Sequence, residues 1–391
     1  MKSLIDNTYW IAVAHLPRWP TERINRFIIQ VVHEHKMTWA DFFELDSKVW
    51  KETFGFSDKE INDVEVARND LPRLAFIAEQ LDSEGFQVIP VNSPDYPTVL
   101  KDNLKVKSSP PVIYIKGRKG LLQEEAVAIV GARKSGNLAL EFTDHVAKKT
   151  VQEHKVVVSG FAKGVDKQAL DSSIKYNGKS IIVLPQGILT FQAGFKKYYQ
   201  PIINGDVLVL STFFPKAGWE VGLAMARNVY IYGLAKEIYV AESDNKGGTW
   251  EGAIDGLKRK RRIYVRMPKQ NEKNANKVLI DMGGIPVDMN GEIANTKNPL
   301  QYSIRDQELN IVNEPAGIYE VADKSKNIER EILDLLKKGS FSAKEIMLTL
   351  KLDWEGKKLS NFLKSNPNVK SLGGKPARFC ISDSTAPSLF G

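Results

Sequence analysis

The chain has 391 residues, of which 42% are hydrophobic and 26% charged, a composition typical of soluble globular proteins with two or three domains. Its formal net charge of +8 favours polyanionic partners, such as nucleic acid, over acidic proteins. The single cysteine, Cys380, excludes an intrachain disulfide, and no apolar run reaches the roughly 20 residues needed to span a membrane. The N-terminus also lacks a signal-peptide pattern, so we expect a cytoplasmic protein without membrane contact.

Residues 1–85 predict a helical domain. Apolar residues recur at helical spacing over 19–35, where Thr21 is a possible N-cap, and the pattern continues over 39–54 and 71–85. We expect a bundle of four or five short helices.

Residues 86–288 predict a domain of strands alternating with helices. After strand-like runs at 86–91 and 110–117, six apolar strands are expected at 126–130, 156–159, 180–185, 206–211, 237–242 and 262–266. Helix-length segments separate these six runs, which indicates a parallel sheet covered on both faces, as in a Rossmann-like α/β fold. Ligands of such sheets bind at the carboxyl ends of the strands.

Two of these strands end in small and cationic residues before a helix begins. The first turn reads GARKSG at 131–136, and the second reads SGFAKGVD at 159–166. Such a turn holds backbone N–H groups and a helix N-terminus towards an anion, and Arg133, Lys134 and Lys163 add full charges. The pair of turns therefore predicts a site for a phosphate-bearing ligand.

The C-terminal part predicts a linker and a small domain. Residues 289–326 are polar and Asn-rich, as in a linker. Helices are expected over 328–339, from the capping box at 342–345 onward, and over 354–366, and a hairpin over 369–381 turns at Gly373–Gly374. This order indicates a winged helix within 327–383, and the residues leave open whether it binds DNA or protein.

Two further segments allow more than one interpretation. The basic run at 258–262 could follow a nucleic-acid backbone, although its position after a helix favours a helix-end role at the opposite edge of the sheet. The turn Gly247–Gly248–Thr249, with Glu251 nearby, resembles part of the glycine-rich turn of LOG-type phosphoribohydrolases. A sensor of a nucleotide ligand, or an enzyme that cleaves its N-glycosidic bond, is therefore the alternative. No catalytic set, metal-ligand group or cofactor motif can be assembled from the sequence.

The middle of the chain resembles the DprA/Smf family of DNA-processing proteins. The motifs that carry the resemblance occur in the family's order: DYP at 95–97, PPVIYIKG at 110–117, VAIVGARKSG at 127–136, VVVSGFAKGVDKQA at 156–169, IIVLPQG at 181–187, ARNVYIYGLA at 226–235 and NANKVLIDMGGIPVD at 274–288. The helical front, which would be SAM-like or helix-hairpin-helix-like, and the winged-helix tail also occur in that family. The resemblance implies a non-enzymatic homodimer that binds single-stranded DNA in a basic Rossmann-like pocket, protects it and loads RecA in transformation or recombination.

The candidate site combines the matched motifs with the glycine-rich turn. In the resemblance Arg133 pairs with phosphate, Ser159 and Gly160 offer a hydroxyl and a close backbone approach, and Asp166 caps the following helix. The expected DNA- or phosphate-binding residues are Gly131, Arg133, Lys134, Ser135, Ser159, Gly160, Lys163, Arg227, Asn228, Gly247, Gly248 and Thr249. The chain departs from the family at Ala132, Thr212, Val229 and the stretch after Gly187, and Val229 removes one expected cation.

Overall fold

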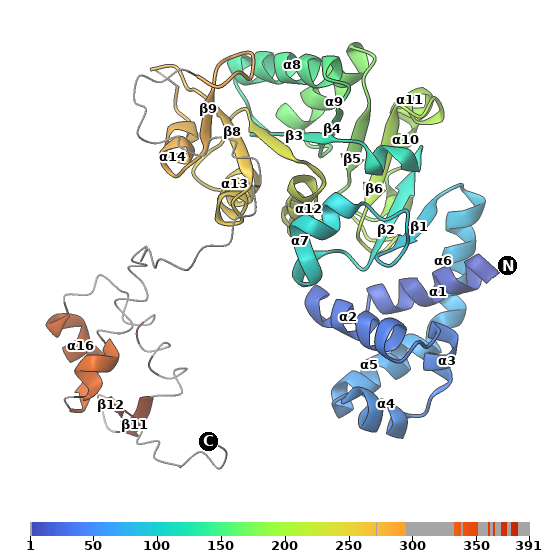
Figure 1. The fold of residues 1–391 in the computed structure, drawn as a ribbon, viewed down its shortest axis with the longest axis vertical. Coiled ribbons are helices and arrows are strands. Elements are labelled where there is room, and N and C mark those ends of the chain that lie inside the picture. The colour runs from blue at the N-terminus through green and yellow to red at the C-terminus, as the bar shows by residue number, and fades with distance from the viewer. Residues whose placement is uncertain are drawn as a thin grey trace, which may run out of the picture. The chain divides into compact units, whose positions relative to one another are not determined.

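The computed structural model describes residues 2–270, 272–294, 332–337, 339–350, 359, 363, 369–373 and 377–381. Residues 1–299 form one compact unit and residues 300–391 form a second (Figure 1). The finer division of the chain at residues 85, 288 and 326 stays a prediction. Within the described residues, no helix combines the length and the apolar character that crossing a membrane requires.

The N-terminal segment folds into more helices than the four or five expected. Within residues 2–83 they are α1 (Lys2–Ala14), α2 (Thr21–Ile28), α3 (Trp39–Glu44), α4 (Ser47–Phe54), α5 (Asp58–Asn69) and α6 (Leu71–Ser83), with the π-helix η1 (Ile29–Glu34) directly after α2. Capping boxes at Thr38–Asp41 and Ser57–Glu60 begin α3 and α5. Thr21 is the first residue of α2 rather than its cap, because the N-cap is Pro20.

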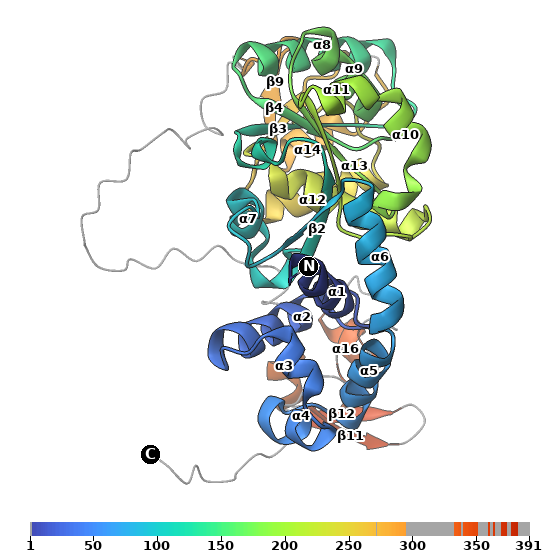
Figure 2. The same cartoon turned by 90° about the vertical axis from the view of Figure 1, so that its right-hand side faces the viewer.

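These helices pack around an aromatic core that is continuous with the edge of the sheet. Phe27, Phe42 and Trp50 belong to the same buried cluster as Tyr114 and Val209 of the sheet. Figure 2 shows α1 and α6 directly against the end of the sheet domain. Burial of large aromatic side chains on both sides of this junction accounts for one compact unit over residues 1–299.

A sheet of nine strands forms the centre of the first unit. The strands are β1 (Gln87–Pro90), β2 (Val112–Lys116), β3 (Ala126–Val130), β4 (Val156–Ser159), β5 (Ser180–Val183), β6 (Val207–Ser211), β7 (Glu237–Val240), β8 (Arg262–Arg266) and β9 (Ile285–Val287). Their order is β1-β2-β6-β5-β4-β3-β7-β8-β9, and only the β1–β2 and β2–β6 pairs are antiparallel. The six expected parallel strands are confirmed, and β9 extends the sheet beyond the prediction.

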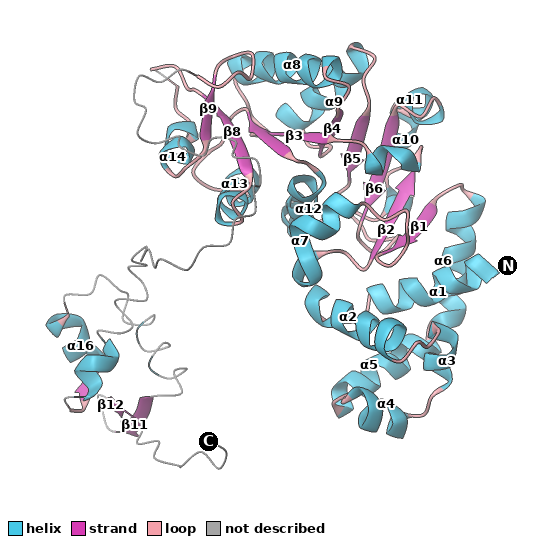
Figure 3. Cartoon of the chain, viewed as in Figure 1, coloured by secondary structure: helices cyan, strands magenta, loops and turns pink. Residues whose placement is uncertain are grey.

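Helices cover both faces of this sheet, as the apolar strands require (Figure 3). They are α7 (Thr98–Ser108), α8 (Asn137–Gln152), α9 (Val165–Lys175), α10 (Gln192–Lys197), α11 (Tyr199–Ile203), α12 (Val221–Leu234), α13 (Gly248–Lys258) and α14 (Asn276–Asp281), with 3₁₀ turns η2 (Lys119–Gln123) and η3 (Ile188–Thr190). One core packs α8 and α9 on one face, and another packs α7, α12, α13 and α14 on the other. The α/β fold with a mostly parallel sheet is therefore confirmed.

The second unit contains short elements around a small core. They are a helical stretch at 332–337, β10 (Phe341–Ser342), α16 (Ala343–Thr349), β11 (Val369–Gly373) and β12 (Arg378–Ile381), and the strands pair antiparallel in the order β10-β12-β11. The capping box at Ser342 and the hairpin over 369–381 are confirmed. Most of the linker (295–326), the start of the first helix (328–331), all of the third helix (354–366) except Leu359 and Leu363, and the hairpin turn at 374–376 lie outside the described residues.

Candidate nucleic-acid interface

The site lies where the chain reverses its direction across the sheet. On one side of β3 the sheet continues with β4, β5 and β6 in chain order. The chain then crosses back, and β7 pairs with the other side of β3. The loops after β3, β4 and β7 meet at this point, because Ala132 N–H donates to Glu242 O at 2.9 Å and Val165 N–H donates to Ala132 O at 3.5 Å. A parallel sheet opens a crevice at such a point, at the carboxyl ends of its strands.

A cavity of about 420 Å³ occupies this crevice. It is lined by Val130–Lys134, Ala162, Asp166, Asp244, Lys246–Thr249 and seven residues of α12, which are Val221, Ala224, Met225, Arg227, Asn228, Ile231 and Tyr232. Eight of the expected residues line it: Gly131, Arg133, Lys134, Arg227, Asn228, Gly247, Gly248 and Thr249. The structure therefore brings the first turn, α12 and the glycine-rich turn together, whereas Ser135, Ser159, Gly160 and Lys163 lie outside the lining.

Cationic side chains stand at the rim of the cavity. Arg133, Lys134 and Lys246 are exposed. Within the described part of the chain, none of the three makes an ion pair or a side-chain hydrogen bond. An exposed Lys163 lies on the adjacent loop. This loop, which follows β4, contacts the turn after β3, because a Cβ placed on Gly164 (φ +84°) would lie 2.4 Å from Ala132 O. The first two turns thus present exposed cations on one side of the molecule, next to the carboxylates of Asp166 and Asp244 in the cavity lining.

A buried ion pair forms the inner wall. Arg227 Nη1 lies 3.6 Å from Asp166 Oδ2, with the two residues 3% and 6% exposed. Burial raises the pKa of the Asp166 carboxyl and lowers the pKa of Arg227, and each partner's charge opposes that shift. Arg227 also donates to Val183 O at 3.3 Å, while its Nε–H has no protein partner. Arg227 thus supports the inner wall of the cavity, and little of its side chain is accessible to a ligand.

Two residues of the second turn differ from the expectation. Ser159 is fully buried and its hydroxyl donates to Ile129 O at 2.7 Å, so that hydroxyl is not available to a phosphate. Gly160 is covered by the guanidinium, because a Cβ there would lie 1.3 Å from Arg227 Nη1. The glycine therefore admits an arginine of the same chain and not, as predicted, a ligand.

The start of α8 is also occupied from within. Gly136 N–H donates to Glu242 Oε2 at 3.4 Å, so a carboxylate of the chain stands where the sequence placed an outside anion. Ser135 lies outside the cavity lining, and its Oγ is buried without a partner in the structure. Glu242 thus takes the expected anion position at the start of α8, and the role of Ser135 stays a prediction.

The start of α13 contributes three consecutive residues to the cavity lining. Gly247 (φ +89°) is its N-cap residue, no side chain caps it, and Gly247, Gly248 and Thr249 all line the cavity. Asn228 packs on it, since a Cβ on Gly248 would lie 2.4 Å from Asn228 Nδ2. Free N–H groups at a helix start, with a side-chain amide and nearby cations, provide donors for a phosphate.

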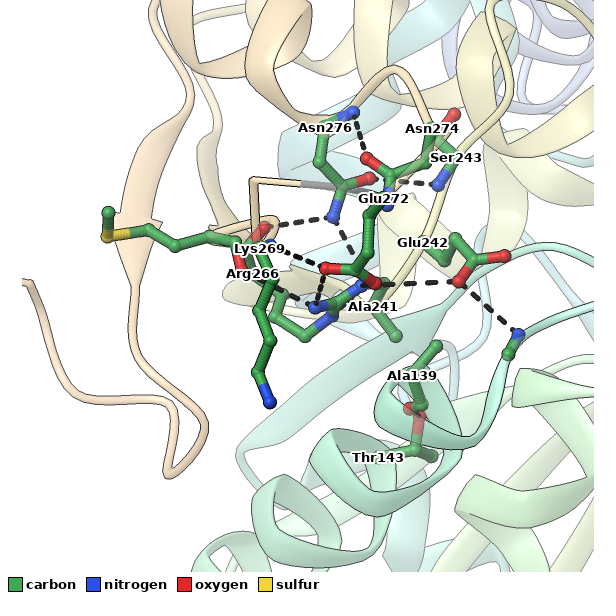
Figure 4. A network of polar contacts seen from close by, with 12 residues as sticks. Ala139, Thr143, Ala241, Glu242, Ser243, Arg266, Lys269, Glu272, Asn274 and Asn276 are labelled. Carbon is green, nitrogen blue, oxygen red and sulfur yellow. Dashed lines mark hydrogen bonds and ion pairs between the residues drawn. The ribbon is translucent and has the colours of Figure 1, made fainter.

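A buried network fixes the loop that carries this helix start (Figure 4). Arg266 is fully buried and holds Glu272 in a bidentate pair at 2.7 and 2.9 Å. Its Nε–H donates to Ala241 O at 2.8 Å, and Asn276 Oδ1 accepts from Ser243 N–H at 2.9 Å. Arg266, Glu272 and Asn276 were not expected to be functional from the sequence. The signals that it offers are an arginine that ends an apolar strand and the asparagines of the motif at 274–288.

The remaining candidates lie elsewhere. The basic run at 258–262 ends α13 and begins β8, at the edge of the sheet opposite the cavity; Arg259 pairs with Asp255 at 2.8 Å and Arg261 donates to Ala235 O. This agrees with the helix-end interpretation. Glu251 is exposed and is not part of the cavity lining. Among the described residues, no cluster of three His, Cys, Asp or Glu side chains could hold a metal ion.

Comparisons with known proteins point to one protein family. The family model of the DNA recombination-mediator protein A matches residues 87–296. Protein Smf of Synechocystis is 30% identical over 221 residues, which cover 54% of each chain. The DNA processing protein DprA of Streptococcus pneumoniae is 31% identical over 148 residues, 38% of this chain and 52% of that one. The chain thus spans about half the length of these two curated relatives.

A solved structure shares the fold. The X-ray structure of DprA from Streptococcus pneumoniae has a TM-score of 0.53 at 22% sequence identity, and the match covers 72% of this chain and 94% of that one. The matched family region contains the whole parallel sheet and every residue of the cavity, and it is more than half of the 391-residue chain. The resemblance seen in the motifs is confirmed, and the chain belongs to the DNA recombination-mediator protein A (DprA/Smf) family.

Proposed function

We propose that the cavity binds the sugar-phosphate chain of single-stranded DNA, without catalysis. The proposal rests on Arg133, Lys134 and Lys246, three cations at the cavity that make no ion pair with any described residue. The first residues of α13 also line this cavity. Cations without intramolecular partners release the counterions of a polyanion, and free N–H groups at a helix start fit phosphate oxygens. Contacts of this kind position a strand and carry little sequence information.

A titration of labelled oligonucleotides at two ionic strengths tests this proposal. We expect single strands to bind more tightly than duplex, with little dependence on sequence, and affinity to fall by roughly 10-fold or more between 50 and 200 mM salt, because several phosphates are neutralised. Equal binding of single strand and duplex, or affinity independent of salt, would contradict it.

The same titration tests the winged helix, which we propose for residues 327–383. The order of helix, β10, α16 and the β11–β12 hairpin around Ile346 and Phe379 supports this assignment. In a chain truncated before residue 327 we expect single-strand affinity to stay within about threefold. Loss of duplex binding alone would identify the second unit as a DNA reader, and loss of single-strand binding would place the main site there.

We further propose a cytoplasmic homodimer that protects single strands and promotes RecA loading in transformation or recombination. The family membership supports this, and α14 offers a self-association face, where Val278 and Met282 are 47% and 52% exposed one helical turn apart. Light scattering should give twice the chain mass of 43.9 kDa, and a larger complex when RecA is added. A measured mass equal to one chain would contradict the homodimer. A mass that stays the same when RecA is added would contradict the interaction with RecA.

The alternative is a nucleotide-ligand sensor or a LOG-like phosphoribohydrolase on the same sheet. It is favoured by Gly247, Gly248 and Thr249 in the lining of a cavity of about 420 Å³, a size suited to a small ligand. Exposure of Glu251 outside that lining argues against the hydrolase. The protein would be a phosphoribohydrolase if it released free base from nucleoside monophosphates and if the Glu251→Gln variant lost this activity.

A further inference from the structure

An exposed apolar strip borders the cationic cavity. We call it the apolar lip; it consists of Trp219, Val221 and Met225, which are 52%, 66% and 38% exposed. Val221 and Met225 line the cavity and lie four residues apart on α12, so they share one face of that helix. Trp219 comes two residues before Val221, so the two Cα atoms are at most about 7 Å apart.

The indole of Trp219 has no partner in the structure. It makes no aromatic, cation–π or hydrogen-bond contact with any described residue, unlike Trp10, Trp19, Trp39 and Trp50 of the first unit. Exposed apolar side chains that gather at the mouth of a cavity indicate a binding surface. A ligand that covers the apolar lip must present flat, apolar groups. The same ligand must also carry an anion that reaches the cations of the neighbouring cavity.

We propose that the apolar lip, with Trp219 at its centre, is a stacking platform for the unpaired bases of the strand whose phosphates the cavity holds. The proposal rests on the proposed function and deepens it. Every base presents a π-face, so stacking on an indole is tolerant of sequence but requires that the base be unpaired. The narrow cavity favours the flexible backbone of a single strand, and the lip would strengthen that preference, because it contacts the bases themselves.

Abasic oligonucleotides separate stacking from phosphate binding. A labelled oligo-dT and an abasic strand of equal length and charge are titrated against the full chain, Trp219→Ala, Trp219→Phe and Trp219→Leu. The wild type should bind oligo-dT roughly 10-fold or more tightly than the abasic strand. Trp219→Ala and Trp219→Leu should remove most of that difference and leave abasic binding within about twofold, whereas Trp219→Phe keeps most of it because phenylalanine also stacks.

Phe76→Ala is the matched control, because Phe76 is a 72% exposed aromatic residue on α6, outside the cavity. It should leave both affinities unchanged. The proposal is overturned if the wild type binds both strands equally, if Trp219→Ala leaves oligo-dT binding intact, or if it weakens both strands alike. The last result, with a reduced particle mass, would assign the lip to an interface between copies of the chain. Should Trp219→Ala fold poorly, the Phe and Leu variants decide.

Failure of the phosphate site is a separate result. If Arg133→Glu leaves abasic binding unchanged, the cationic cavity does not hold the phosphates, whatever Trp219 does. If Arg133→Glu abolishes abasic binding while Trp219→Ala has no effect on oligo-dT, the proposed function stands and the platform is removed.

Discussion

Arg133→Glu should weaken the binding of a single-stranded oligonucleotide on the order of 100-fold at 50 mM salt. The substitution removes an exposed guanidinium without an intramolecular partner and puts a negative charge on the rim of the cavity. The slope of log affinity against log salt should also fall by about one or more, because fewer counterions are released. Fluorescence polarisation at several salt concentrations measures both quantities.

Lys258→Glu is the control for the change in net charge. Lys258 is an exposed lysine at the end of α13, at the edge of the sheet opposite the cavity. Replacing it with glutamate changes the total charge of the protein by the same two units as Arg133→Glu. We expect its affinity to stay within about threefold of the wild type. If the two variants weaken binding alike, the protein attracts DNA through its overall charge and not through the cavity. If neither does, the site lies elsewhere.

The strands and turns of the sheet domain were predictable because their signals are local. Apolar runs such as Ala126–Val130 and Val207–Ser211 are buried on both faces, and that alone indicates strands of a covered parallel sheet. The parallel arrangement then brings the strand ends together, so Arg133 and Lys134 could be assigned to the crevice. Asn228, on α12, could be assigned only from the family resemblance.

The inward or outward direction of polar side chains was not predictable, because it depends on partners distant in sequence. Arg227 points inward towards Asp166, which lies in the first turn of α9, about sixty residues earlier in sequence. Glu242 occupies the start of α8, 106 positions from Gly136 in sequence. A motif shows that an arginine or a serine is present, whereas its burial is decided by the carboxylates and carbonyls that the fold brings to it.

The same reason explains the N-terminal segment. Its helical periodicity predicted helices but not their partner, and the structure joins them to β2 and β6 through one aromatic core. Thr21 has the chemistry of a cap, yet Pro20 precedes it in an extended conformation and takes the N-cap position.

Gly160→Ala should destabilise the first unit by on the order of 3 kcal/mol, the cost of breaking a buried ion pair. The new Cβ would lie 1.3 Å from Arg227 Nη1 and 2.4 Å from Asp166 Oδ2, so the guanidinium must leave its position and the carboxylate loses its nearest cation. The midpoint of thermal unfolding should fall by roughly 5 °C, because the entropy of unfolding is large for a unit that spans residues 1–299. Gly120→Ala, where a Cβ meets nothing within 4 Å, should change stability by less than about 0.5 kcal/mol.

A double-mutant cycle identifies the cause of this loss. Arg227→Ala removes the guanidinium that occupies the space beside Gly160, and it breaks the same pair with Asp166. If collision with Arg227 is the reason for the cost, Gly160→Ala added to Arg227→Ala should lower the free energy of unfolding by less than about 1 kcal/mol further, because the pair is already lost. Additive effects of the two substitutions would mean that the new methyl group collides mainly with Asp166 Oδ2, 2.4 Å from the added Cβ, and not with the guanidinium.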